Sequence, residues 1–158
     1  MVLSEQEGLL RIAIVDLETA EVSSDPAVFR EGAWGFWLQQ AVQKALKAWL
    51  MQLGGAPPLT HDLRRLLLLL EAEGVATADL EPLAQLTVYA VQFRYDADPA
   101  LLGLDREAFN RQVKELINRG QELVVPGSEA EARGLCHAPA PPSSSISACA
   151  RPSPSACA

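Results

Sequence analysis

Apolar residues recur through most of the chain at intervals of three and four positions, the spacing that places side chains on one face of an α-helix. In the first such stretch Leu9, Ala13 and Leu17 repeat in this way, while Arg11, Asp16 and Glu18 fall on the other side. Helix-favouring residues dominate as far as residue 133, and the strict alternation typical of strands is scarce. Glycines and prolines divide this region into about five segments. The expected helices cover residues 7–22, 26–53, 60–74, 77–94 and 105–124.

The links between these segments are short, which favours antiparallel neighbours. We therefore expect an all-α fold, an antiparallel up-and-down bundle of about five helices. The second helix is the longest, and its wide apolar face makes it the expected spine. The residues expected to cap helix starts are Asp25 with Pro26 after it, Thr60, Thr77 or Asp79, and Asp105.

The composition changes near Gly134, where the helical pattern stops. Residues 134–158 contain five prolines and six serines but one charged residue, Arg151. Such a stretch buries too little apolar surface to offset the entropy of ordering it. The sequence predicts one helical domain, residues 1–130, and a disordered low-complexity tail, residues 131–158.

Charge and targeting signals narrow the functional class. With 13 Lys plus Arg against 20 Asp plus Glu, the net charge of −7 argues against a phosphate-binding surface spread over the whole molecule, although it leaves room for a local basic patch. The N-terminus is acidic, and the longest Leu run, residues 66–70, is far shorter than a membrane span. We expect a soluble, cytoplasmic protein that does not contact a membrane. The three cysteines all lie in the last quarter of the chain, which gives neither a metal knuckle nor a disulfide framework.

The residues able to carry chemistry are few. The helical region contains one histidine and lacks the patterns of phosphate-binding loops, dinucleotide-binding turns, zinc proteases and calcium loops, so we expect no metal and no cofactor. Lys44 and Lys47 are either a solvated edge of the second helix or a phosphate contact. His61, beside Asp62 at a helix start, is suited to donate a hydrogen bond to a carbonyl or carboxylate, with a role as general base as the alternative.

Three arginines are further candidates. Arg64 and Arg65 are either surface charge or an anion site. Arg94 continues the apolar stripe of the fourth expected helix, where an unpaired buried guanidinium would be strongly unfavourable. We expect Arg94 either to pair with a carboxylate of a neighbouring helix or subunit or to bind a ligand, with Tyr95 beside it.

Three short stretches together resemble the HEPN domain family. They are Gln-Ala-Val-Gln-Lys-Ala-Leu-Lys-Ala at 40–48, Thr-His-Asp-Leu at 60–63 and Arg-Tyr-Asp at 94–96. They are similar in order and spacing to the family's Q-A-x-E-K-A-L-K-A, T-H-D-L and R-Y-P-D stretches, and the resemblance covers roughly residues 7–125. Gln43 stands where the family often has glutamate, and Asp96 stands where proline is usual.

The resemblance implies a helical nucleotide-binding module that forms a homodimer and is often paired with a minimal nucleotidyltransferase, as in two-gene toxin–antitoxin systems. An apolar surface larger than the helices can cover would favour a dimer. We expect Trp34, Trp37 and Trp49 to supply this interface.

The resemblance also bears on catalysis. The family's ribonuclease branch places a histidine after an arginine and four to six intervening residues, and no histidine follows Arg94 at this spacing. We therefore expect a non-catalytic component that binds a nucleotide, RNA or a nucleotidyltransferase through Lys44, Lys47, His61, Arg94 and Tyr95. The alternative is a metal-independent ribonuclease in which Arg94 stabilises the phosphate and His61 or Tyr95 moves the proton.

Overall fold

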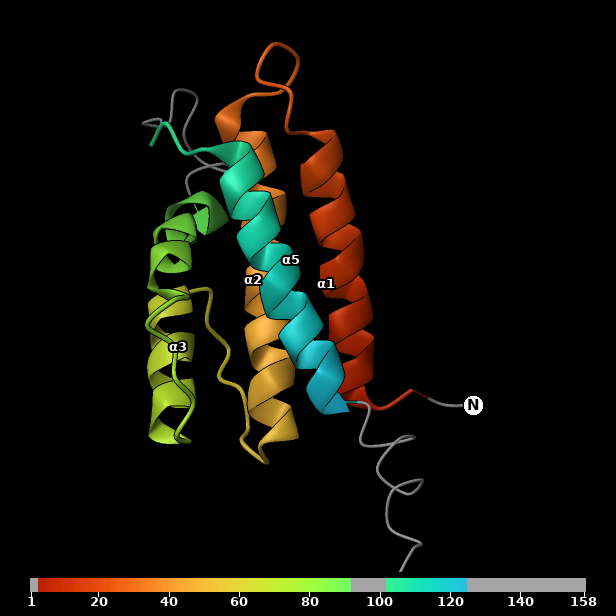
Figure 1. The fold of residues 1–158 in the computed structure, drawn as a ribbon, viewed down its shortest axis with the longest axis vertical. Helices are drawn as coiled ribbons and strands as arrows, with labels where there is room; N and C mark the ends of the chain where they lie inside the picture. The colour runs from red at the N-terminus through yellow and green to blue at the C-terminus, as the bar shows by residue number, and fades with distance from the viewer. Residues whose placement is uncertain (1–2, 92–101, 125–158) are drawn as a thin grey trace, which may run out of the picture. The chain divides into compact units, whose positions relative to one another are not determined.

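The computed structural model describes residues 3–91 and 102–124, and these form an all-α fold without strands (Figure 1). The predicted helical bundle is confirmed. The predicted tail and its boundary near residue 130 lie outside the described residues, as do all three cysteines. No helix among the described residues is both long and apolar enough to span a membrane. The elements are α1 (Glu5–Val22), α2 (Glu31–Gln52), α3 (Leu63–Ala72), the 3₁₀ helix η1 (Glu81–Val88) and α5 (Arg106–Val124).

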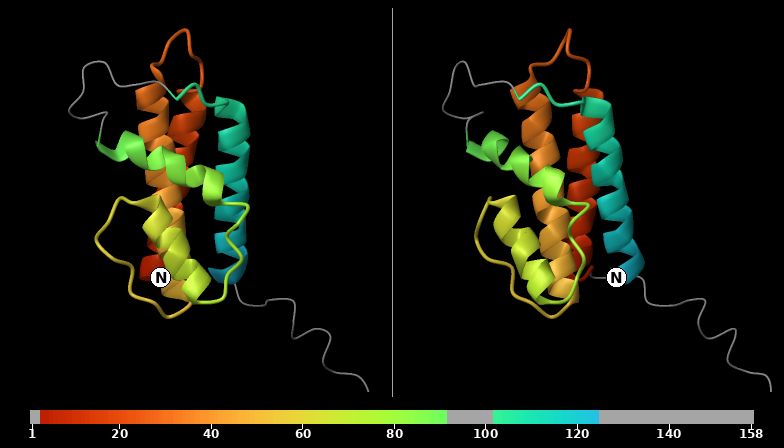
Figure 2. Two further views of the ribbon diagram at one scale, coloured as in Figure 1. Left: turned by 90° about the vertical axis from the view of Figure 1, so that its left-hand side faces the viewer. Right: turned by 60° about the vertical axis from the view of Figure 1, so that its left-hand side comes forward.

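Three long helices, α1, α2 and α5, pack against one another, while α3 and η1 cover another side of α2 (Figure 2). The helix directions follow from contacts at the two ends of the bundle. Arg106, which begins α5, donates to the carbonyls of Ser23 and Phe29, and Gln52, which ends α2, donates to the carbonyl of Leu123 near the end of α5. Helix α5 therefore runs parallel to α2 and antiparallel to α1 (Figure 1).

Helix α2 is the central element, as its long apolar pattern predicts. It contacts α1, α3, η1 and α5, and most of its residues are buried. Its fully buried Leu38, Val42 and Leu46 join the core with leucines of α3 and η1. Burial of large aliphatic side chains stabilises the fold by roughly 1.5–3 kcal/mol for each residue.

The starts of α1 and α5 follow ordinary capping rules. Ser4 and Glu7 form a reciprocal capping box, so α1 begins at Glu5, two residues before the expected start. The hydrogen bonds from Ser4 to the Glu7 carboxylate lower the pKa of that group. At α5, Asp105 accepts from the amide of Ala108, which confirms the predicted cap.

The prediction for the start of α2 was wrong by five residues, because α2 begins at Glu31 and not at Pro26. Asp25 caps a separate turn instead, since its carboxylate accepts from the amide of Ala27 and its carbonyl from that of Phe29. This turn ends before α2 because Glu31 is turned inward, where it accepts hydrogen bonds from Tyr89 and the loop before α5.

Two other predicted starts also differ. Asp62, and not Thr60, caps α3 by accepting from the amide of Arg65. Neither Thr77 nor Asp79 caps the next helix, because Thr77 donates to Glu71 and Asp79 pairs with Arg119. The short η1 stands in its place, residues 89–91 are helical, and the last part of the expected helix, which includes Arg94, lies outside the described residues.

Two of the three tryptophans, Trp34 and Trp49, contradict their predicted place at an interface, whereas the prediction for Trp37 is not tested. Trp34 is fully buried, where its indole N–H donates to Asn110 at 2.9 Å and its ring meets Phe109 edge-on. Trp49 is also buried, and Trp37 alone of the three is exposed, at 38%. The sequence pattern could not separate these positions, because a helix packed on several sides buries aromatic residues in more than one direction.

Candidate functional site

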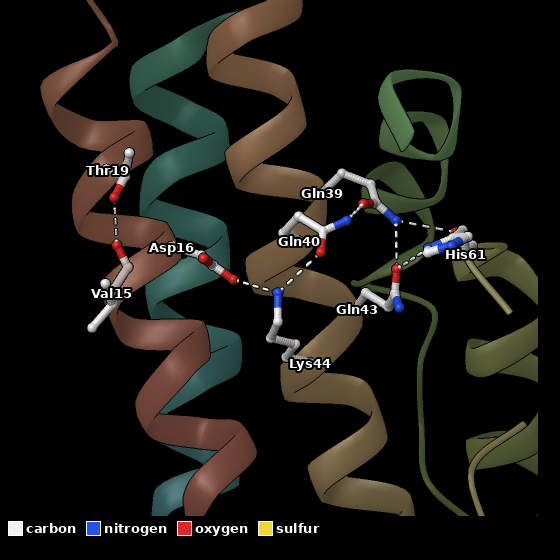
Figure 3. A network of polar contacts seen from close by, with 8 residues as sticks. All are labelled: Val15, Asp16, Thr19, Gln39, Gln40, Gln43, Lys44 and His61. Atoms are coloured by element: carbon white, nitrogen blue, oxygen red, sulfur yellow. Dashed lines mark hydrogen bonds and ion pairs between the residues drawn. The ribbon is translucent and has the colours of Figure 1, made fainter. Parts of the chain in front are cut away.

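A continuous series of polar contacts crosses α2, from α1 on one side to the loop before α3 on the other (Figure 3). We call it the α2 polar chain. Three of its residues, Asp16, Gln39 and Gln43, are buried, where each polar group needs a partner. Its members are Asp16 of α1, then Lys44, Gln40, Gln39 and Gln43 of α2, and His61.

The chain begins with an ion pair between α1 and α2. The Lys44 ammonium lies 2.6 Å from the Asp16 carboxylate, and the two side chains are only 20% and 9% exposed. Lys44 also donates to the side-chain oxygen of Gln40 at 3.0 Å. Lys44 is therefore not part of a solvated edge, because it neutralises a nearly buried carboxylate.

Three glutamine amides continue the chain through α2. Gln40 donates to the Oε1 atom of Gln39 at 2.8 Å. The Nε2 group of Gln39 then donates to the Oε1 atom of Gln43 and to the backbone carbonyl of His61, both at 3.1 Å. Since the Gln39 side chain is fully buried, these bonds satisfy an amide that has no access to water.

His61 ends the chain at the surface. Its Nδ1 atom lies 2.9 Å from the Oε1 atom of Gln43, and the residue as a whole is exposed. The Nε2 atom of the ring has no hydrogen bond to any residue that the structure describes. His61 thus has a hydrogen-bond partner at the start of α3, and this partner is the side-chain amide oxygen of Gln43 and not a backbone carbonyl or a carboxylate.

Lys47 lies one turn from Lys44 on the same side of α2. Partial burial lowers the pKa of the Lys47 ammonium, and the charge of Lys44 lowers it further. Across residues 3–91 and 102–124, no carboxylate forms an ion pair with Lys47. The α2 surface therefore holds a half-buried cation whose charge the described residues leave unneutralised.

Arg64 and Arg65 do not join this site. Arg64 forms an exposed ion pair with Glu81 at 3.3 Å, and Arg65 is exposed. Arg94 and Tyr95 lie outside the described residues. No group of three or more His, Cys, Asp or Glu within the described ranges could hold a metal ion.

The polar chain lies within the part of the sequence that matches a known family. The model described as "HEPN domain" matches residues 6–126. The chain belongs to the HEPN domain family. It is thus a module of a family related to nucleotides and RNA. No curated protein and no solved structure matches the chain.

Sequence reasoning missed Asp16, Gln39, Gln40 and Gln43 as members of this HEPN site. Asp16 was assigned to the polar side of its helix, although it lies between the buried Ala13 and Ala20 in the apolar repeat. Gln39 likewise interrupts the apolar face of α2, next to Leu38. A polar residue at a position that the periodicity marks as buried was the available signal, since such a residue needs a specific partner.

Replacing Lys44 with methionine should destabilise this HEPN domain by about 1–2 kcal/mol, because the nearly buried Asp16 carboxylate then loses its counter-charge. Urea unfolding followed by tryptophan fluorescence measures the effect. Lys47→Met is the matched control, and it should leave stability unchanged or raise it. Equal losses in the two variants would show that the effect comes from removing an ammonium group of α2 and not from the ion pair with Asp16.

Proposed function

We propose that this HEPN domain is a non-catalytic module that binds the phosphate of a nucleotide at the α2 surface formed by Lys44, Lys47 and His61. Lys47 carries the proposal, because it is a half-buried ammonium without an ion-pair partner among the described residues. A phosphate would supply the missing negative charge and form charge-assisted hydrogen bonds.

The two lysines have different roles in this proposal. Lys44 is already held by Asp16 and Gln40, so Asp16 offsets most of its charge and Lys44 is not the direct ligand of the phosphate. Lys47 is free to bond the phosphate directly. With a net charge of −7 over the whole chain, one local uncompensated cation would favour a small phosphate-bearing ligand over non-specific contact with long nucleic acids.

The non-catalytic role rests on the sequence, which lacks the arginine–histidine spacing of the ribonuclease branch. We also propose a minimal nucleotidyltransferase as the partner in a two-gene toxin–antitoxin system, on the strength of the family membership. Arg94 and Tyr95 remain proposed ligand contacts on the basis of the sequence alone.

Calorimetric titration with AMP, ATP and inorganic phosphate tests the binding proposal. We expect ATP to bind, and Lys47→Gln to weaken binding by roughly tenfold through the loss of one charge-assisted bond. Lys114→Gln removes an exposed lysine of α5 that lies 4.0 Å from Glu21, and it should leave affinity unchanged. An equal loss of affinity in the two variants would show that only the net charge of the protein matters. If the wild-type protein bound no nucleotide, the proposal would be wrong.

Two further measurements address the remaining candidates. A thermal shift with ATP should be smaller in Arg94→Ala if Arg94 contacts the ligand. Incubation of the protein with RNA tests the ribonuclease alternative. We expect the RNA to remain uncut. Cleavage by the wild-type protein that is lost in His61→Ala would show that the domain is a ribonuclease and not a binding module.

We also propose that the domain forms a homodimer through α1. Ile12, Val15 and Val22 follow the three-and-four spacing on its outer side and are 48%, 58% and 75% exposed. An apolar stripe of this kind is suited to packing against a second helix.

Light scattering should give twice the monomer mass of 17.0 kDa for the wild-type chain. Val15→Glu should yield monomers, because it places a charge within the stripe. Val28→Glu changes a valine that is 69% exposed outside α1, and it should leave the mass unchanged. A monomeric wild-type chain, or a dimer unaffected by Val15→Glu, would exclude this interface.

A further inference from the structure

The α2 polar chain has a fixed direction, because each hydrogen bond needs one donor and one acceptor. An ammonium group only donates, so the atom of Gln40 that faces Lys44 must be its oxygen. The amide nitrogen of Gln40 then points the other way and donates to Gln39, whose facing atom must in turn be an oxygen. The ion pair at α1 thereby orients the first two amides.

The far end of the chain imposes the same direction independently. A backbone carbonyl only accepts, so the atom of Gln39 that meets the His61 carbonyl must be its nitrogen. That same nitrogen donates its second hydrogen to Gln43, whose facing atom must be an oxygen. Both ends therefore agree on a single orientation of Gln39 and Gln43.

The Gln43 oxygen also meets Nδ1 of His61 at 2.9 Å, and two acceptors cannot share a hydrogen bond. We infer that Gln39 and Gln43 are positioning residues that hold His61 with its proton on Nδ1, so that Nε2 presents its lone pair at the surface. A partner on one ring nitrogen commonly sets the state of the other in this way. The neutral ring is thus an acceptor, and a directly bound ligand group must donate to it.

This inference deepens the proposed function and rests on it for the ligand. A nucleotide carries hydroxyl donors on its ribose beside its phosphate. The class of ligand that suits the surface therefore combines an anion for Lys47 with a hydroxyl for Nε2 of His61. A phosphate oxygen that carries only lone pairs would be disfavoured beside the unprotonated Nε2 atom of the neutral ring.

Nitrogen-15 NMR of the full chain without ligand reads the ring state directly, at a pH where the imidazole is neutral. His137→Gln removes the second histidine and assigns the His61 signals. We expect a protonated Nδ1 and an unprotonated Nε2. Protonation on Nε2, or an even mixture, would overturn the inference.

Two variants at Gln43 form a matched pair. Gln43→Glu keeps an acceptor at the same place, so His61 should keep its proton on Nδ1, whereas Gln43→Leu removes the partner and should give both tautomers. Gln39→Glu removes the donor that orients Gln43, so the Gln43 amide should turn over and the proton move to Nε2. Circular dichroism establishes that each variant is folded. If His61 kept its proton on Nδ1 in Gln43→Leu, Gln43 would not be the residue that fixes the tautomer.

A ligand arm separates this inference from the proposed function. ATP should bind more tightly than 2′,3′-dideoxy-ATP, and Gln43→Leu should narrow the difference. If neither nucleotide binds, the proposed function fails while the NMR reading of His61 stands. If both bind equally, the ribose hydroxyls do not meet Nε2, and the inferred ligand class fails while nucleotide binding stands.

Discussion

Replacing Glu31 with alanine is expected to lower the free energy of unfolding by about 3–5 kcal/mol, the largest effect of any single change considered for this domain. The buried Glu31 carboxylate accepts a hydrogen bond from the hydroxyl of Tyr89 and from the amides of Leu102 at 2.7 Å and Gly103 at 3.1 Å. Alanine would leave these donors without a partner. Chemical unfolding followed by tryptophan fluorescence measures the loss.

Two conservative variants divide this effect. Glu31→Gln keeps one oxygen acceptor and should cost less than alanine, while Tyr89→Phe removes only the hydroxyl and should cost about 1 kcal/mol. Burial and the hydrogen bond to Glu31 raise the pKa of Tyr89, so the hydroxyl stays protonated and able to donate at neutral pH. If Glu31→Ala proved as stable as the wild type, the carboxylate would not tie these elements together.

Replacing Gly35 with alanine should destabilise the domain by about 2–3 kcal/mol, because the new methyl group has no room. A Cβ atom built at Gly35 would lie 2.6 Å from two atoms of the Tyr89 ring, which is itself buried. The ring would have to move, and overpacking of this kind outweighs the better helix propensity of alanine. Urea unfolding of the variant tests the expectation.

Gly8→Ala is the matched control, because Gly8 also lies within a helix but a Cβ atom there would meet nothing within 4 Å. This change should stabilise the domain by about 0.5–1 kcal/mol. A smaller side chain at Tyr89 should recover part of the loss in Gly35→Ala if the contact causes it. A loss in Gly35→Ala that persists unchanged in the double variant would point to the helix backbone instead.

The sequence predicted the features of the fold that depend on local chemistry. The three-and-four spacing placed the helices, and the Asp105 cap follows from the side chain and its own helix. The start of α2 was misplaced because it depends on Glu31 reaching Tyr89 and Leu102, residues far away in the sequence. Such contacts leave no periodic signal.

The candidate site was predicted in part for the same reason. Lys44, Lys47 and His61 stood out by residue type. The hydrogen bonds that connect Lys44 to His61, however, pass through Gln39 and Gln43. Glutamine is common on ordinary helix surfaces, so residue type does not mark these two as internal partners. Their place on the apolar face of α2 signals burial but does not identify the partner of either residue. Only the packing of α1 and the loop before α3 against α2 reveals their role.

The burial of most of α2 also limits how related proteins can diverge. Most of its residues are packed on one neighbour or another, and the less covered ones include Gln40, Lys44 and Lys47. Mutations elsewhere on this helix must keep the core intact before selection can act on anything else. A new ligand specificity would therefore have to arise from substitutions at the few less covered positions of α2, or from substitutions in the segments around it.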